Sequence, residues 1–156
     1  MARLYRRGRV RAFQALFEAE FERVGAEVAL EREGGQRLSA AEREHAERLV
    51  AGVQARREEL DAIIREVAPA FPVPQLAVVD RTVLRIALYE LLFNNAAVPV
   101  AAVINDAVEL AKTFGSDSSR RFVNGVLGTV SRARLPAPEE ALIGSAEETE
   151  EPSGAL

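Results

Sequence analysis

Apolar residues recur every three or four positions along almost the whole chain, and the alternation that marks a β-strand is almost absent. This periodicity is typical of amphipathic helices, which bury one stripe of side chains. With a bend expected near Arg56, it predicts an all-α protein of six or seven helices and no sheet. The apolar stripes lie at about 4–24, 40–67, 81–93, 99–114 and 118–130.

Polar residues and glycines indicate where these helices begin and end. The sequence "SAAE" at 39–42 has the spacing of a capping box. Asp80 is expected to cap the apolar helix that follows it, and Ser116 or Asp117 to cap the last helix. Gly115 is expected to end the preceding helix in the left-handed conformation.

The segment "FPVP" at 71–74 is a stiff connector and the expected boundary between two subdomains. We expect one domain over residues 1–135, with an N-terminal half at about 1–70 and a C-terminal half at about 75–135. Residues 136–156 carry six glutamates, no basic residue and many small or proline residues. Because such a composition cannot bury much apolar surface, we expect a disordered acidic tail.

The stretch "RRFVNGVLGTV" at 120–130 is ambiguous when taken alone. Asn124-Gly125 between apolar pairs favours a hairpin, but a lone hairpin has no sheet to join here. The apolar residues also fall at helical spacing, and we predict a helix. Since glycine costs a helix about 1 kcal/mol relative to alanine, we expect Gly125 and Gly128 to allow close approach of the 81–93 helix.

The composition excludes several classes of function. The chain has 156 residues and no cysteine, so disulfides and cysteine-based zinc sites are excluded. His45 is the only histidine; it is expected on a solvated helix surface, without the clustered ligands that a metal needs. Phosphate-binding glycine loops and long apolar runs are absent from the sequence. We therefore expect a cytoplasmic protein that is not an enzyme, has no metal or cofactor, and does not enter a membrane.

Two basic clusters indicate a nucleic-acid-binding function. The first is at the start of the first helix and includes Arg6, Arg7 and Arg9, where cations oppose the helix dipole. The second flanks the loop "TFGSDSS" and comprises Lys112, Arg120 and Arg121. Arginine and lysine side chains at such positions supply phosphate contacts without sequence information.

Serines and phenylalanines accompany the second cluster. The hydroxyls of Ser118 and Ser119 add donors at a helix start, where backbone N–H groups attract phosphate. Phe114 and Phe122 are candidates to stack on unpaired bases, with a place in the core as the alternative for each. Loops with stacking residues suit unpaired bases, so single-stranded RNA is favoured over duplex DNA.

Three segments together resemble the NusB family of transcription antitermination factors. They are "RRGRVRAFQALFEAE", "VLRIALYELL" and "VPVAAVINDAVELAKTFGSDSSRRFVNGVLG". The resemblance extends from Arg6 to about Val130 and is weak over 25–40. It implies two small packed helical bundles without enzymatic activity. It also implies binding to boxA RNA jointly with NusE, a ribosomal protein of the small subunit, and indirect contact with other Nus factors and RNA polymerase.

The resemblance also implies roles for individual residues. The RNA-facing set would be Arg6, Arg7, Arg9, Lys112, Phe114, Gly115, Ser116, Ser118, Ser119, Arg120, Arg121 and Phe122. The set that faces the protein partner would be Phe17, Asp80 and Arg81. Phe17 stands where the family often has tyrosine, and Ser118 where it often has an acid. Because Ser118 removes a negative charge beside the RNA, tighter RNA binding is expected.

Two alternatives stay open from the sequence. The first is an RNA-recognition domain like that of some ribosomal RNA methyltransferases, but such enzymes need a large cofactor domain and usually catalytic cysteines. The second is a protein-only dimeric adaptor whose arginines are simply solvated. The sequence does not decide between a monomer and a homodimer, because relatives of both kinds occur.

Overall fold

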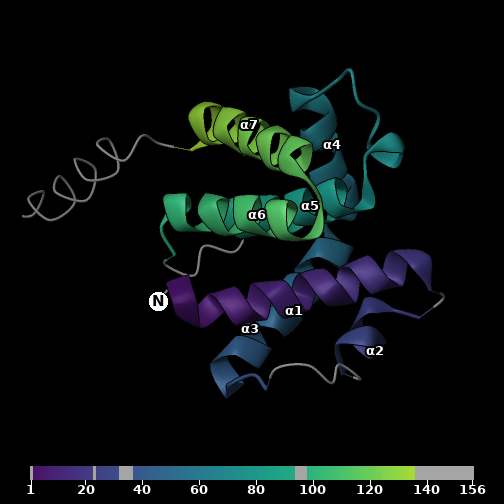
Figure 1. Cartoon of the computed structure of the whole chain (residues 1–156), viewed down its shortest axis with the longest axis vertical. Helices are drawn as coiled ribbons and strands as arrows, with labels where there is room; N and C mark the ends of the chain where they lie inside the picture. The colour runs from purple at the N-terminus through teal and green to yellow at the C-terminus, as the bar shows by residue number, and fades with distance from the viewer. Residues whose placement is uncertain (1, 23, 32–36, 94–97, 136–156) are drawn as a thin grey trace, which may run out of the picture.

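The computed structural model describes residues 2–22, 24–31, 37–93 and 98–135. Within these ranges the chain forms seven α-helices and one short 3-10 helix, with no strand (Figure 1). The predicted all-α fold of six or seven helices is therefore confirmed. The elements are α1 (Ala2–Phe21), α2 (Ala26–Glu31), α3 (Ala40–Ala55), α4 (Arg57–Val67), η1 (Val73–Gln75), α5 (Val78–Leu92), α6 (Val100–Phe114) and α7 (Asp117–Arg134). The expected disordered tail at 136–156 lies outside the described residues.

Helix α5 is the centre of the fold. It packs against α1, α3, α4, α6 and α7, and most of its length is buried, as its nearly all-round apolar sequence predicts. Helices α1, α2 and α3 pack on one another on one side of it, and α6 and α7 pack together on the other (Figure 1). The chain bends at Arg56, as expected, and beyond the bend α4 contacts α5, η1 and α7. Helix α4 also contacts α3, so it touches helices of both predicted halves.

Side-chain caps begin two of the helices as predicted. The Ser39 hydroxyl accepts from the Glu42 backbone N–H at 3.1 Å, and the Ser39 N–H donates to the Glu42 carboxylate at 2.8 Å, which completes the capping box. The Ser116 hydroxyl accepts from the Ser119 backbone N–H at 3.2 Å and caps α7.

The predicted cap at the start of α5 and the predicted left-handed residue at the end of α6 were both wrong. Helix α5 begins at Val78 with Ala77 as its N-cap, so Asp80 lies inside the first turn instead of capping it. An acid at this position is still favourable, because it faces the positive end of the helix dipole. Gly115 follows α6 with φ −116°, which is not the left-handed region. Its lack of a Cβ instead leaves room for Ser119, whose Oγ would lie 2.6 Å from an added Cβ.

The stretch 120–130 lies wholly within α7, and the hairpin alternative is excluded. Its inward face packs into the core through Val123, Val126, Leu127 and Val130. Phe122 is half-buried, and its ring meets the Phe71 ring edge-on at 5.5 Å between centroids.

The expected reason for the glycines in α7 was wrong. A Cβ added at Gly125 would meet no atom within 4 Å, and one added at Gly128 would meet the side chain of Arg132 on the same helix at 3.3 Å. Close helix approach occurs instead at Gly8 of α1, where an added Cβ would lie 2.7 Å from the Glu42 carbonyl oxygen of α3. The conformational cost of Gly125 therefore has no packing gain to offset it.

A buried ion-pair network joins α1 to the C-terminal helices. Arg9 is 2% exposed, and its Nε donates to Glu90 Oε1 of α5 at 2.8 Å. Its Nη2 donates to the second Glu90 oxygen, and its Nη1 donates to Asp106 of α6, both at 2.5 Å. Arg9 is thus held between two helices that are far from it in the sequence.

His45 belongs to the same buried region, so its expected place on a solvated surface was wrong. The side chain is 0% exposed, and its Nε2 lies 3.3 Å from Glu90 Oε2. The Tyr5 ring covers it with 4.3 Å between ring centroids. His45 faces inward because it precedes Leu49 by one helical turn on the buried side of α3.

Gly125→Ala should raise the free energy of unfolding by up to about 1 kcal/mol, because alanine forms helix more readily and the site is open. Gly8→Ala should lower it by about 1–3 kcal/mol, because the new methyl group would push α1 away from the α3 backbone. Urea unfolding followed by circular dichroism measures both. A destabilised Gly125→Ala protein, or a neutral Gly8→Ala protein, would contradict this account of the glycines.

Glu90→Gln should change how the free energy of unfolding depends on pH in the acidic range. Burial alone would raise the pKa of Glu90, but the Arg9 guanidinium hydrogen-bonded to it outweighs burial and lowers the pKa below the ordinary value of 4.5, with a smaller contribution from the nearby His45. The stabilisation from ionised Glu90 is therefore complete above about pH 4.5 and is lost as the pH falls through the lower pKa of the folded state.

Unfolding free energies measured from neutral pH down to pH 3 test this expectation. Glu90→Gln should be less stable than the wild type at neutral pH by about 3 kcal/mol, with a gap that narrows in acid. The exposed Glu44→Gln is the matched control and should show no comparable gap. A gap for Glu90→Gln that is constant with pH would overturn the assignment.

Candidate nucleic-acid interface

A groove with a volume of about 170 Å³ lies between α1 and α6. It brings the first predicted basic cluster next to the end of α6, where the second cluster begins. The groove is lined by Arg6, Arg9 and Val10 of α1 and by Asp106, Glu109, Leu110, Thr113 and Phe114 of α6. We call it the α1–α6 groove.

Phe114 closes one end of the α1–α6 groove. Its ring contacts the buried Phe13 ring, with 4.8 Å between centroids, while the residue stays 41% exposed. It is therefore anchored and also open to a ligand. Arg6 precedes Phe13 by seven residues, which places the arginine roughly 10 Å further along the helix axis. The groove therefore presents a cation and an exposed aromatic ring on one surface, the two kinds of group that contact the backbone and the bases of unpaired nucleic acid.

The residues of the second cluster lie in the last turn of α6, in the turn after it and in the first turn of α7, and none of them except Phe114 lines the groove. Lys112, Ser118 and Arg121 are exposed, and neither Lys112 nor Arg121 has an ion-pair partner among the described residues. Arg120 is half-buried, with its Nε 3.8 Å from Asp117 Oδ1. Ser116 and Gly115, also exposed, form the turn between α6 and α7.

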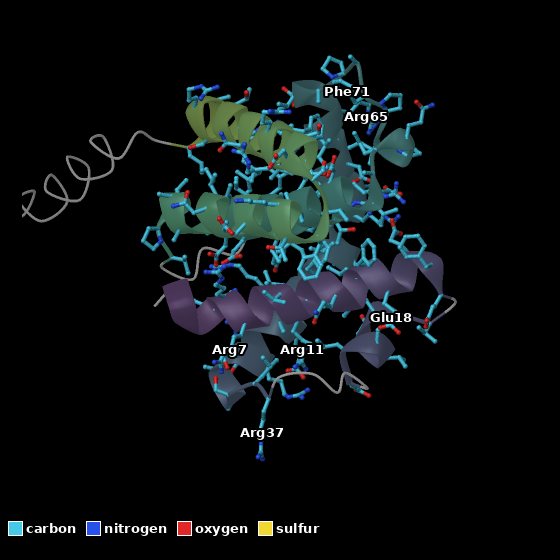
Figure 2. All side chains as sticks on the ribbon, in the orientation of Figure 1. Arg7, Arg11, Glu18, Arg37, Arg65 and Phe71 are labelled. Atoms are coloured by element: carbon cyan, nitrogen blue, oxygen red, sulfur yellow. The ribbon has the colours of Figure 1, made fainter. Side chains whose placement is uncertain are left out.

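Four of the predicted RNA-facing residues present no free side chain on this surface. Arg9 is buried and fully engaged by Glu90 and Asp106, so its guanidinium is not available to a ligand. Figure 2 shows Arg7 on the side of α1 that is turned away from α6. Ser119 is 6% exposed beneath its cap, and Phe122 packs against Phe71.

Two acidic residues of the groove were missed from the sequence. Asp106 is neutralised by Arg9, whereas Glu109 is exposed and has no ion-pair partner among the described residues. Because a free carboxylate repels phosphate, Glu109 disfavours a phosphate group directly beside it in the groove. Asp106, Leu110 and Phe114 are spaced four residues apart, and this spacing places the three side chains on one face of a helix. It was the sequence signal that could have revealed Asp106.

The residues predicted to face a protein partner lie at one end of the molecule. The Phe17 ring packs between Phe13 and Phe21, at 5.5 and 4.9 Å between centroids, and Phe21 is 65% exposed. Arg81, in the first turn of α5, donates through Nε to Glu20 of α1 at 2.8 Å. Asp80 precedes it, and its Oδ1 is buried without a hydrogen-bond partner in the described part of the chain.

The described residues contain no group of three or more acidic or histidine side chains arranged to hold a metal ion. None of the described helices combines the length and the apolar character that a membrane crossing requires.

The structure is that of an all-helical protein with a groove between α1 and α6 that is lined by basic, acidic and aromatic side chains. A family model described as "NusB family" matches residues 6–132. The chain belongs to the NusB family, as its sequence motifs predicted.

Curated relatives and solved structures agree with this assignment. A transcription antitermination protein NusB from Chloroflexus aggregans is 52% identical over 80% of this chain and 84% of its own length. Another from Herpetosiphon aurantiacus is 48% identical over 88% of this chain and 94% of its own. The structure of T. maritima NusB superposes with a TM-score of 0.78 at 35% identity, covering 85% of this chain and 93% of that one. A crystal structure of antitermination factors NusB and NusE in complex with double-stranded RNA gives 0.73 at 26% identity, covering 85% and 99%.

Proposed function

We propose that this protein is a transcription antitermination factor that binds boxA RNA together with NusE and thereby promotes processive transcription of ribosomal RNA operons. The observation that supports RNA binding most directly is the α1–α6 groove, in which Arg6 and Phe114 line one open surface. Membership of the NusB family supports the transcriptional role.

In this proposal the cationic edges hold the RNA backbone, while the groove floor receives a base. Arg6 contacts a phosphate at the groove, and Lys112 and Arg121 extend the path over the last turn of α6 and the first turns of α7. Phe114 stacks on an unpaired base, a contact worth about 1–3 kcal/mol. Ser116 and Ser118 offer hydroxyl donors at the turn.

NusE would bind at the end of the molecule where Phe17, Phe21, Asp80 and Arg81 lie. An exposed phenylalanine beside half-buried ones gives an apolar anchor of the kind that dominates protein interfaces. The ion pair between Arg81 and Glu20 keeps the ends of α1 and α5 in one rigid surface.

Fluorescence anisotropy with labelled boxA RNA, with and without NusE, tests the proposal. We expect saturable binding that NusE tightens and that weakens steeply as the salt concentration rises. An affinity that neither NusE nor salt changes would refute the proposal. A chain that self-associates but binds no RNA would instead favour the dimeric adaptor.

Charge-removing substitutions on the groove edges should weaken RNA binding without unfolding the protein. Arg6→Gln, Lys112→Gln and Arg121→Gln should each lower the affinity severalfold and reduce the slope of log affinity against log salt by about 0.7. Arg43→Gln is the matched control, because Arg43 is exposed on α3, away from the groove. Equal losses for Arg43→Gln and for the groove variants would contradict this placement of the RNA path.

Ser118→Asp should weaken boxA binding, because it adds a negative charge beside Arg121 at the start of α7. The same change should leave the free energy of unfolding equal or slightly higher, because a negative charge in the first turn interacts favourably with the helix dipole. Ser118→Asn supplies the same shape without the charge and should bind as the wild type does. Anisotropy and thermal unfolding separate the two effects, and an unchanged affinity for Ser118→Asp would exclude an influence of this position on RNA.

A further inference from the structure

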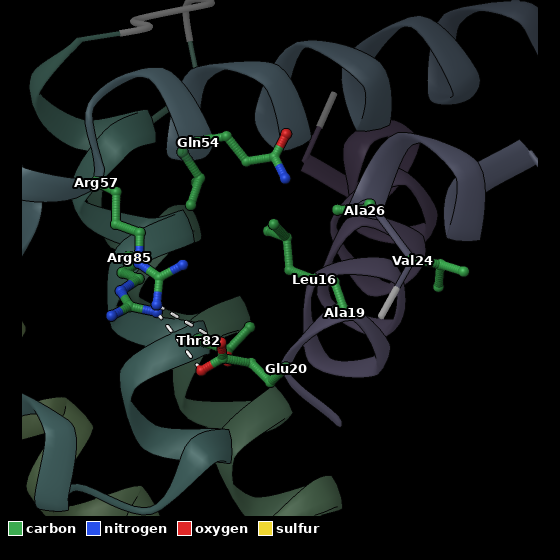
Figure 3. A pocket seen from close by; sticks show the side chains of 11 residues that line it. Leu16, Ala19, Glu20, Val24, Ala26, Gln54, Arg57, Thr82 and Arg85 are labelled. Atoms are coloured by element: carbon green, nitrogen blue, oxygen red, sulfur yellow. Dashed lines mark ion pairs between the residues drawn. The ribbon is translucent and has the colours of Figure 1, made fainter. Parts of the chain in front are cut away.

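The arginines of this fold differ in whether a nearby carboxylate compensates their charge. In the pocket between α1, α3 and α5, Arg57 and Arg85 face Glu20 at 3.6 and 3.8 Å, so their charge is met from within the protein (Figure 3). Arg134 of α7 is likewise paired with Glu66, at 2.7 Å. An exposed arginine without such a partner keeps its charge for a ligand.

Helix α7 carries two exposed arginines, Arg121 and Arg132, that have no carboxylate partner among the described residues. Eleven residues separate them, which corresponds to three helical turns. They therefore lie on one face of α7, with about 16 Å between them along the helix axis. The helix contains four arginines and a single acidic residue, Asp117, so it is positively charged as a whole.

The guanidinium group of Arg132 lies back along the helix, on the side of Arg121. A Cβ added at Gly128 would lie 3.3 Å from Arg132 Nη1, so the guanidinium occupies space that a side chain at position 128 would fill. Its Nη2 lies 3.4 Å from Thr129 Oγ1, and the Thr129 hydroxyl donates to the Gly125 carbonyl oxygen at 3.0 Å. Gly128 and Thr129 thus position the charged group on the exposed face, which reduces the side-chain entropy that binding would cost.

These features favour a phosphate group as the ligand of Arg132. Its Nε and Nη1 donate to no acceptor in the described part of the chain, since its one hydrogen bond there is the contact with Thr129. A guanidinium with free donors binds phosphate in a forked arrangement. Arg121 already continues the proposed RNA path beyond the α1–α6 groove, and Arg132 is the next uncompensated cation on the same face of α7.

We propose that Arg132 binds a phosphate of RNA outside boxA, where the strand continues from Arg121 along the exposed face of α7. This inference rests on the proposed function, because it extends the path of the same RNA. Guanidinium contacts with phosphate carry no sequence information. The RNA that flanks boxA therefore raises the affinity whatever its sequence.

Fluorescence anisotropy with labelled RNAs of different length, in the presence of NusE, tests this extension. The first RNA is boxA alone, and two others carry a run of unpaired uridines on the 5′ or the 3′ side, long enough to reach from Arg121 to Arg132. One of the two extended RNAs should bind severalfold more tightly than boxA alone. Its slope of log affinity against log salt should be steeper by about 0.7, the value for one further phosphate contact on a single strand.

Substitutions on α7 separate this site from general attraction between arginine and RNA. Arg132→Gln should abolish the gain from the flanking RNA and leave the affinity for boxA alone unchanged. Thr129→Val keeps the charge of Arg132 but removes the hydroxyl beside it, so it should lose part of the gain. Arg134→Gln is the matched control, because it removes the same charge from the same end of α7, where Glu66 already pairs with the arginine. All three positions are exposed, so each variant should unfold close to the wild-type temperature.

The same titrations distinguish a failure of this extension from a failure of the proposed function. If no RNA of any length binds, the proposed function fails and the extension fails with it. If boxA binds but neither flank adds affinity, or if Arg132→Gln and Arg134→Gln reduce the gain equally, the extension alone is overturned. A gain that appears only after Glu139→Gln and Glu140→Gln, the first acids beyond α7, would assign Arg132 to the acidic tail instead of RNA and would also overturn the extension.

Discussion

The position of α1 on the rest of the molecule depends on the buried guanidinium of Arg9. This group joins α1 to Glu90 of α5 and Asp106 of α6, and Glu90 in turn lies beside His45 of α3. Burying these charges is costly, and their mutual attraction offsets the cost only when the geometry is correct. An α1 that slid along α5 by one turn would leave both carboxylates buried without a partner. The network therefore selects one register among several that apolar packing alone would allow.

The α1–α6 groove follows from the same constraint. Its two walls are α1 and α6, and the bond from Arg9 to Asp106 fixes the distance between them. Arg6 and Val10 lie on the outer side of the turn that carries Arg9, so their position is determined by a residue that no ligand touches. The arginine-rich start of the helix thus combines two roles: one side chain builds the groove, and another offers its charge to the groove surface.

Local sequence signals predicted the helices well, because each helix is specified by neighbours a few residues apart. The capping box at 39–42 and the cap at Ser116 are contacts over three residues, and both formed as expected. The roles of Arg9 and Glu90 were not predictable in this way, since the two residues are 81 positions apart. A single acid within the apolar helix 81–93 was nevertheless a signal that a buried cation would meet it.

The candidate site was predictable in part for the same reason. Both basic clusters were found from charge alone, but their separation in space depends on the packing of α1 against α6. Phe114 and Phe122 have similar local surroundings in the sequence, and only the distant Phe71 determines that one is covered while the other is open. The glycines of α7 were misinterpreted because helical spacing does not reveal whether a face meets a neighbour or solvent.

The α1–α6 groove has a consequence for the order in which this protein becomes functional during synthesis. The α1 wall leaves the ribosome before the other wall, which follows only after α5 has been made. A nascent chain that ends at α5 has Arg9 and Glu90 but lacks Asp106 and the aromatic end of the groove at Phe114. Since domains fold as units during translation, the complete groove appears late, when most of the helical domain has emerged. Incomplete chains therefore carry the arginines of α1 without the second wall of the groove.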